Sequence, residues 1–388
     1  MTPWLLVPPV VAFVATYAMM PWVLRAAREW GVVQPPHRER DSHRSTIPRM
    51  GGLAMGIGFL VAGVVAAVLP VPRTDPGEGL RLFGLLAGAL LAGLAGLADD
   101  RMELGPWRQA LFQLGLGAVA LATTIWIRDV NNPFGPGFLW DAERGFPMFL
   151  VIPITLFWFM GAINTINFID GLDGLAAGVA TIASIVFALH MLSLNQVSVA
   201  LLPLALAGAT VAFLRFNFFP ARTFMGSTGA YFLGYTLAAL AIIAGAKIAS
   251  LLLVLAVPIL DTAWLIFSRL RRGQNPMHGS RDHLHHRLYD VGFSQRQVVL
   301  GYWALTTVTG MLSLVLPGRR SKLYVLLLLA GPNGQRPRMV EDATNPAGAP
   351  LLDWHSPLAD AIDRAAAEGF ALGRHTTEPL SDDVYKRG

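Results

Sequence analysis

A cluster of amides and carboxylates occupies residues 164–174, where one long apolar segment ends and another begins. Its polar residues recur every third position, at Asn164, Asn167, Asp170 and Asp173. On an ideal helix a step of three drifts by about 60°, so neighbours adjoin without forming one straight stripe. Gly171 and Gly174 break the helix and let both carboxylates turn toward one site. Because ionisable groups at membrane depth are costly, we favour a functional cluster over an Asn-capped turn.

Two adjacent carboxylates, Asp99 and Asp100, precede Arg101 at the end of an earlier apolar segment. Adjacent carboxylates repel each other unless a cation or a proton separates them. Magnesium usually takes one or two protein carboxylates together with phosphate oxygens of a substrate. Taken alone, the pair also fits a polar helix end that stops at the membrane interface.

Further polar groups follow along the chain. The stretch from Asn217 to Arg222 leads through a glycine-rich turn to Ser227 and a new helix, whose backbone N–H groups favour an anion. Asp261 is a lone carboxylate in an apolar run and should face the interior of the bundle with a partner.

A last group lies in a long polar loop and combines imidazoles with guanidinium groups. Its members are Arg281, His283, His285, His286 and Arg287. Zinc would want further ligands, and the chain has no cysteine to supply them. Histidines among arginines suit a phosphorylated ligand better than zinc or a solvated basic loop.

Composition indicates a membrane protein. Hydrophobic residues make up 54% of the 388 positions and charged residues only 14%, against roughly 25% charged in soluble domains. The absence of cysteine excludes disulfides and thiolate chemistry. We expect an all-α, polytopic bundle over residues 1–331, followed by a polar tail, 332–388, with a short amphipathic helix from Ser356.

A spanning helix needs roughly 20 mostly apolar residues. Such segments lie near 3–24, 51–70, 80–98, 108–127, 146–166, 174–193, 197–214, 228–246, 248–268 and 298–316. An eleventh segment, 323–331, is too short to span and suits a half-helix or the first strand of a small tail domain.

Lys and Arg gather on one set of connections between these segments. The richer connections are 24–50, 99–108, 164–174, 215–227 and 269–297. The excess makes that face cytoplasmic and places the N-terminus outside the plasma (inner) membrane. Every polar cluster described above falls on this face, apart from Asp261 within its apolar segment. Carboxylates, amides, arginines and histidines together suggest metal-assisted phosphoryl transfer onto a lipid phosphate, with no nucleic-acid partner.

The motifs resemble the polyprenyl-phosphate N-acetylhexosamine-1-phosphate transferase family, of glycosyltransferase family 4 type. The matching stretches, between about residues 30 and 316, are Pro48–Gly52, Asp99–Arg101, Gln113, NTINFIDGLDGLAAG, FNFFPARTFMG, Asp261 and HLHHRL. The resemblance implies transfer of a sugar-1-phosphate from a UDP-sugar to undecaprenyl phosphate, with release of UMP. HLHHRL is similar to the branch that starts cell-envelope polysaccharides with GlcNAc-1-phosphate.

The resemblance also implies roles for the residues. Catalytic roles fall on Asp99, Asp100, Asp170 and Asp173. Substrate-binding roles fall on Asn164, Asn167, Asn217, Arg222, Asp261, Arg281, His283, His285, His286 and Arg287. The metal, Mg²⁺ or alternatively Mn²⁺, would be held by Asp170, Asp173 and the residue at 227. Direct attack by the lipid phosphate is favoured over a covalent aspartyl intermediate, and a homodimer is left open.

The chain departs from the family pattern at several positions. Ser227 stands where the family usually has a metal-binding Asp, and Gln109 stands where Lys is frequent. A serine hydroxyl is a neutral, weaker ligand. An impaired homologue that binds lipid phosphate or nucleotide sugar, or acts as a scaffold, is therefore the alternative.

Overall fold

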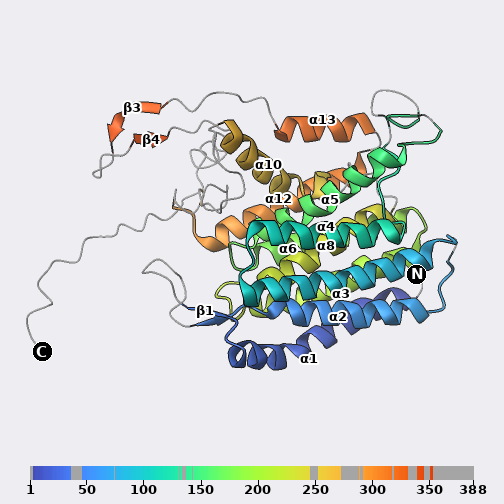
Figure 1. Cartoon of the computed structure of the whole chain (residues 1–388), viewed down its shortest axis with the longest axis horizontal. Coiled ribbons are helices and arrows are strands. Elements are labelled where there is room, and N and C mark those ends of the chain that lie inside the picture. The colour runs from blue at the N-terminus through green and yellow to red at the C-terminus, as the bar shows by residue number, and fades with distance from the viewer. Residues whose placement is uncertain are drawn as a thin grey trace, which may run out of the picture. The chain divides into compact units, whose positions relative to one another are not determined.

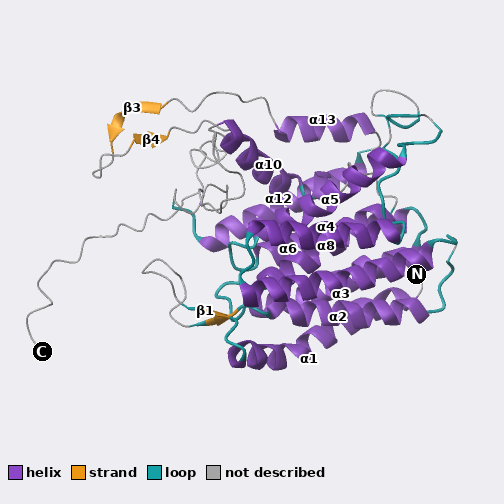
Figure 2. Cartoon of the chain, in the orientation of Figure 1, coloured by secondary structure: helices purple, strands orange, loops and turns teal. Residues whose placement is uncertain are grey.

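The chain separates into two compact units, Met1–Leu329 and Ala330–Gly388. The computed structural model describes residues 3–35, 46–73, 75–130, 132, 137–141, 143–244, 252–271, 288, 292–316, 319–330, 339–344 and 350–352. The first unit is a bundle of helices with one small hairpin (Figure 1, Figure 2). The described part of the second is a two-stranded antiparallel sheet, β3 (Met339–Thr344) with β4 (Pro350–Leu352), with a register irregularity.

The helices of the first unit follow the apolar segments of the sequence. They are η1 (Pro3–Leu6), α1 (Val7–Glu29), α2 (Gly51–Val68), α3 (Glu78–Met102), α4 (Pro106–Ala122), α5 (Met148–Ile169), α6 (Leu175–Ser193), α7 (Val197–Asn217), α8 (Gly226–Ile243), α10 (Ala256–Arg271), α12 (Gln295–Val315) and α13 (Arg319–Ala330). The strands β1 (Val33–Gln34) and β2 (Ile47–Pro48) pair antiparallel just before α2.

The prediction of an all-α polytopic bundle is confirmed. Among the described residues, 8 helices are long and apolar enough to cross a membrane. The predicted spans 108–127 and 248–268 correspond to α4, of 17 residues, and α10, of 16 residues, which are shorter. The count of ten spans therefore stays a prediction. Residues 323–330 of the eleventh segment lie within helix α13, so of the two alternatives the helix is confirmed and the strand was wrong. The tail helix predicted from Ser356 lies outside the described residues.

Helix α8 lies at the centre of the bundle and packs against α2, α3, α5, α6 and α7. Of the 18 residues of this helix, 94% are buried inside the bundle. Small residues on the neighbouring helices let the backbones approach closely, as is usual between membrane helices. Gly96 on α3 is one example, because a Cβ there would collide with the carbonyl of Ser227. Helices α3 and α8 therefore pack closely near the end of α3 that carries Asp99 and Asp100.

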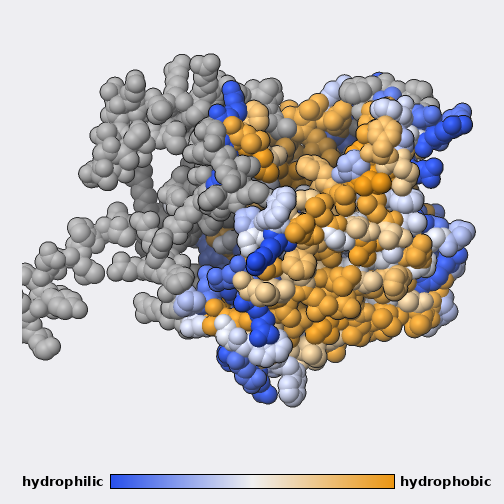
Figure 3. Space-filling model, viewed as in Figure 1, coloured by the Kyte–Doolittle hydropathy of each residue, from blue (hydrophilic) through white to orange (hydrophobic). Residues whose placement is uncertain are grey.

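The outer helices present apolar side chains to their surroundings. Phe157, Val68 and Phe83 are 78%, 77% and 66% exposed. A broad hydrophobic band crosses the visible face, with hydrophilic residues gathered at its two ends (Figure 3). Exposure on this scale costs little when lipid rather than water surrounds the band. The two polar ends therefore correspond to the two membrane surfaces.

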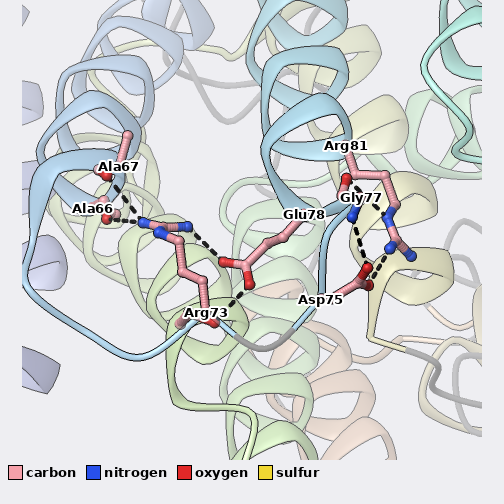
Figure 4. Close-up of polar contacts among 8 residues, drawn as sticks. Ala66, Ala67, Arg73, Asp75, Gly77, Glu78 and Arg81 are labelled. Carbon is pink, nitrogen blue, oxygen red and sulfur yellow. Dashed lines mark hydrogen bonds and ion pairs between the residues drawn. The ribbon is translucent and has the colours of Figure 1, made fainter.

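A partly buried ion pair holds the opposite end of the bundle, where α2 ends and α3 begins. The guanidinium of Arg73 contacts the Glu78 carboxylate at 2.5 Å and donates to the carbonyl of Ala66 at 2.8 Å (Figure 4). Glu78 also accepts a hydrogen bond from the hydroxyl of Ser198 at 3.0 Å. These contacts join the end of α2 to the beginnings of α3 and α7. Because α3 has 25 residues, they lie about 35 Å from its other end.

Candidate active site

The site is built around the beginning of α8. There Asp100, near the end of α3, accepts hydrogen bonds from the backbone N–H of Ser227 and of Thr228, both at 2.8 Å. The Thr228 hydroxyl donates a third, at 2.6 Å. The first N–H groups of a helix have no partner within the helix, and the helix dipole favours a negative charge beside them. Asp100 therefore fixes the start of α8 to the end of α3.

Gly226 makes this approach possible. Its φ of +67° is a left-handed conformation that side chains disfavour. A Cβ at this position would collide with the carbonyl of Arg49 and lie 2.6 Å from Oδ2 of Asp100. The absence of a side chain thus lets three segments distant in sequence meet at one point.

Asp99 serves a different neighbourhood from Asp100, since successive helical residues point about 100° apart. Its Oδ1 accepts hydrogen bonds from the backbone N–H of Leu104 at 3.1 Å and from the side-chain amide of Gln109 at 3.0 Å. Gln109 also donates to the Leu104 carbonyl at 3.1 Å. The buried Asp99 carboxylate is therefore held against the turn between α3 and α4.

Asp173 and Asn217 join the loop after α5 to the segment before α8. Asp173 accepts a hydrogen bond from the backbone N–H of Ala221 at 2.9 Å. Asn217 accepts from the N–H of Gly174 at 3.0 Å and donates to the carbonyl of Thr223 at 2.9 Å. Both side chains are almost fully buried, at 4% and 2% exposure. The structure thus shows these two residues holding the loops of the site in place.

Asp170 lies directly after α5, within electrostatic range of Asp100, Asp173 and Arg49. Burial, and then the negative charge of Asp100, raises the pKa of Asp170 well above its usual range. Arg49 partly opposes this effect, and its Nη2 lies 3.9 Å from Oδ1 of Asp100. These four residues are called the acid cluster below. The cluster brings together acids from the ends of two helices with one arginine.

A pair of amides lies between α4 and α5. Gln113 donates to Oδ1 of Asn164 at 3.1 Å, and Asn164 donates in return to Oε1 of Gln113 at 2.9 Å. Asn164 also donates to the carbonyl of Met160. The amide of Asn164 is therefore engaged with its own and the neighbouring helix.

The other predicted residues have varied positions. Asn167 lies partly buried in the last turn of α5, Arg222 is exposed before α8, and Asp261 is partly buried on α10. Ser227 is the second residue of α8 and is partly buried. The predicted loop residues lie outside the described part of the chain. They are Arg281, His283, His285, His286 and Arg287.

Three residues of the site were not among the predicted ones. Arg49 stands in the Pro48–Gly52 motif, where its charge next to a helix start was the available signal. Thr228 follows the glycine-rich turn, and Gln109 had been noted only as a departure from the family pattern. None of these assignments could be made without knowing which side chains meet.

The described residues contain no group of three or more His, Cys, Asp or Glu placed to share one metal ion. Asp100 Oδ2 already accepts two hydrogen bonds, and Asp173 Oδ2 accepts one. A metal at the acid cluster would therefore take few ligands from these residues and the remainder from substrate oxygens or water, as Mg²⁺ commonly does.

Comparison with known proteins covers the part of the chain that carries these residues. The glycosyl transferase family 4 model matches residues 82–245, which include Asp99, Asp100, the 164–174 cluster and Ser227. A Bacillus subtilis protein described as a probable undecaprenyl-phosphate N-acetylglucosaminyl 1-phosphate transferase is 33% identical over 328 residues, covering 82% of this chain and 87% of the relative.

Two further relatives show the same level of similarity. A decaprenyl-phosphate N-acetylglucosaminephosphotransferase of Mycolicibacterium smegmatis is 33% identical, covering 74% of this chain and 76% of its own. A phospho-N-acetylmuramoyl-pentapeptide-transferase of Desulforudis audaxviator is also 33% identical, covering 78% and 95%. The resemblance read from the motifs is confirmed: the chain belongs to glycosyl transferase family 4, the family of the polyprenyl-phosphate sugar-1-phosphate transferases.

Proposed function

We propose that the protein transfers N-acetylglucosamine-1-phosphate from UDP-GlcNAc to undecaprenyl phosphate and releases UMP. The names of the B. subtilis and M. smegmatis relatives support this sugar and this class of lipid acceptor. The observation that carries the proposal is the acid cluster, in which Asp170 lies within electrostatic range of Asp100, Asp173 and Arg49 at one polar end of a membrane bundle.

The reaction exchanges one phosphoanhydride bond for another. An oxygen of the lipid phosphate attacks the sugar-bearing phosphorus of UDP-GlcNAc, and the bond from that phosphorus to the oxygen of the UMP phosphate breaks. The products are a polyprenyl diphosphate sugar and UMP. Such a transfer depends mainly on positioning and charge neutralisation. Direct attack therefore needs no side-chain nucleophile, and we favour it over an aspartyl intermediate.

The residues of the chain divide into two roles under this proposal. Asp100, Asp173 and Asn217 hold the loops and the start of α8, through the hydrogen bonds described above. Asp170 is the carboxylate best placed to hold Mg²⁺, with the remaining ligands from the diphosphate and water. When bound, the ion would neutralise negative charge on the transferring phosphoryl group. Asp99 faces the turn to α4 and holds that turn in place through Leu104 and Gln109.

The identity of residue 227 bears on the alternative of an impaired homologue. Ser227 binds Asp100 through its backbone N–H, which every residue except proline supplies. Replacement of an acid at this position therefore leaves the contact between α3 and α8 intact. The effect falls on the charge of the metal site alone. We accordingly favour an active transferase that retains the positioning framework and holds its metal with fewer charges.

The setting of the reaction is part of the proposal. We place the protein in the plasma membrane as a multi-pass enzyme whose site faces the cytoplasm, where UDP-sugars are made. The product would begin a cell-envelope polysaccharide. Assembly into a homodimer stays a prediction.

The test uses the full chain, purified in detergent, with undecaprenyl phosphate and a panel of UDP-sugars. We expect UMP release and a lipid diphosphate sugar, detected by mass spectrometry, only with UDP-GlcNAc, lipid phosphate and Mg²⁺ together. Mn²⁺ should substitute in part, and EDTA should stop the reaction. Binding of the substrates without any UMP release would support the impaired homologue instead.

A further inference from the structure

A polar pocket lies beside the acid cluster, where α1 and α3 end and the β1–β2 hairpin follows. Its volume is about 390 Å³, within the usual range for small-molecule sites. It is lined by Trp30, Gly31, Val32, Val33, Arg49, Asp100, Arg101, Met102 and Glu103. Arg49 and Asp100 belong both to the pocket lining and to the acid cluster, so a ligand here would lie beside the proposed reaction centre.

Arg49 supplies one positive charge to this pocket. Its backbone is fixed, because its N–H donates to the carbonyl of Val32 at 3.1 Å. Its side chain is 40% exposed, and its 3.9 Å separation from Asp100 exceeds hydrogen-bond distance. The Asp100 oxygens are meanwhile engaged with the start of α8. The guanidinium of Arg49 therefore keeps donors for a ligand.

Arg101, near the end of α3, supplies a second positive charge to the pocket. Its guanidinium lies over the ring of Trp30, 5.1 Å from the ring centre, and this stacking orients it without using its hydrogen-bond donors. Glu103 also lines the pocket and, like Arg101, is exposed, so solvent and salt screen the charges of both residues. Two arginines from different elements thus face a space that adjoins the acid cluster.

We propose that this pocket binds a phosphate monoester, and that the phosphate is the head group of the lipid substrate. The assignment rests on the proposed function. Trp30 and Met102 on the pocket wall are 48% and 66% exposed, at the polar end of apolar helices. Tryptophan at such a position is typical of the membrane–water interface. A phosphate on a chain held in the bilayer arrives at that height, whereas a nucleotide arrives from water.

The direct test measures binding without turnover. The full chain in detergent is titrated with farnesyl phosphate, and with farnesol as the neutral probe, by native mass spectrometry. Arg49→Gln should weaken farnesyl phosphate binding about 10- to 100-fold, the usual effect of losing a charge-assisted hydrogen bond, and leave farnesol binding unchanged. Arg49→Lys should retain part of the affinity. A thermal melt of each variant shows whether it is folded.

A matched pair of variants separates the pocket from the helix end in general. Arg25 stacks on Trp22 of the same helix, at 5.4 Å, without lining the pocket. Arg101→Gln should weaken farnesyl phosphate binding, and Arg25→Gln should not. Equal effects of the two substitutions would mean that the lipid phosphate responds only to the general positive charge of this face, and would overturn the pocket assignment.

The kinetic test separates the two phosphate sources. Arg49→Gln should raise KM for polyprenyl phosphate at least 10-fold and leave KM for UDP-GlcNAc unchanged. A rise confined to UDP-GlcNAc would overturn the assignment to the lipid, as would unchanged values for both. If the wild type binds farnesyl phosphate through Arg49 but releases no UMP, the pocket stands and the transferase proposal fails. If the wild type releases UMP but Arg49→Gln keeps the wild-type KM and affinity for the lipid phosphate, the transferase proposal stands and the pocket assignment fails.

Discussion

The side-chain amide of Asn217, at the end of α7, accepts a hydrogen bond at 3.0 Å from the backbone N–H of Gly174, at the start of α6. The same amide donates to the carbonyl of Thr223. One buried side chain therefore sets the distance between the loop that carries Asp170 and the segment that leads to Ser227.

Replacement of Asn217 by Ala should separate these loops. Two buried backbone groups would lose their partner, which costs about 1–3 kcal/mol each. We expect a lower melting temperature in detergent and at least a 10-fold loss of UMP release. Ser193→Ala, which removes an exposed hydroxyl bond to His190, is the control and should change neither property. Full activity in Asn217→Ala would contradict the positioning role.

A second prediction concerns Gly226. Gly226→Ala places a methyl group against the Arg49 carbonyl and the Asp100 carboxylate, in a left-handed conformation. We expect the contact between α3 and α8 to open and UMP release to fall more than 10-fold. Gly93→Ala on α3, where a Cβ meets nothing within 4 Å, should instead raise stability by up to about 1 kcal/mol. Assays of both variants in parallel provide the measurement.

The partner of Asp99 provides a third prediction. Gln109→Glu would place a like charge beside the buried Asp99 carboxylate, whose present partner is the Gln109 amide at 3.0 Å. We expect this variant to lose at least 10-fold in kcat, whereas Gln109→Lys, which offers a cation, keeps activity. A steady-state comparison of kcat for the two variants is the measurement. Equal kcat values for the two variants would show that the charge beside Asp99 does not affect catalysis.

A fourth prediction addresses the metal. Ser227→Asp adds a carboxylate at the start of α8 and should lower the Mg²⁺ concentration for half-maximal UMP release about 10-fold. Ser227→Asn, of similar size but neutral, is the control and should leave this concentration near the wild-type value. The Mg²⁺ dependence of initial rates decides between them. An unchanged requirement in Ser227→Asp would place the ion away from residue 227.

The ion pair at the far end provides a fifth prediction. Glu78→Ala leaves Arg73 without its partner in a partly buried setting, and should destabilise the protein by about 3 kcal/mol. The KM values for both substrates should stay unchanged, because the pair is remote from the acid cluster. Asp75→Asn, which breaks the more exposed pair with Arg81, should cost at most about 1 kcal/mol. Thermal melts and initial rates of both variants test this.

The helical bundle was predictable because a long apolar segment in a membrane is stable as a helix. Each segment must satisfy its backbone hydrogen bonds internally, which in a membrane requires helices. Helix lengths were less predictable: α4 has 17 residues where 108–127 had been expected to span. The structure also shows helix α13 (Arg319–Ala330) where a strand had been an alternative.

The carboxylates of the site were predictable from the sequence, but Arg49 and the division of roles among the acids were not. Asp99 and Asp100 look equivalent in sequence, yet one meets Gln109 and the other meets Thr228, 128 residues away. Their separation follows from helix geometry together with the packing of α3 on α8. The spacing of the residues in the sequence does not reveal which partner each of the two acids meets. For Asp173 and Asn217 too, residue type and spacing do not indicate that their oxygens accept backbone N–H groups.

Because Asp100 on α3 bonds the start of α8, the activity should depend on the lipid or detergent that surrounds these two helices. A detergent that loosens the seam between these two helices would shift Asp100 relative to Asp170 while every helix remained intact. When lipid is removed, the rate of UMP release should therefore fall before the helix content measured by circular dichroism does. The rate should recover when lipid is added back.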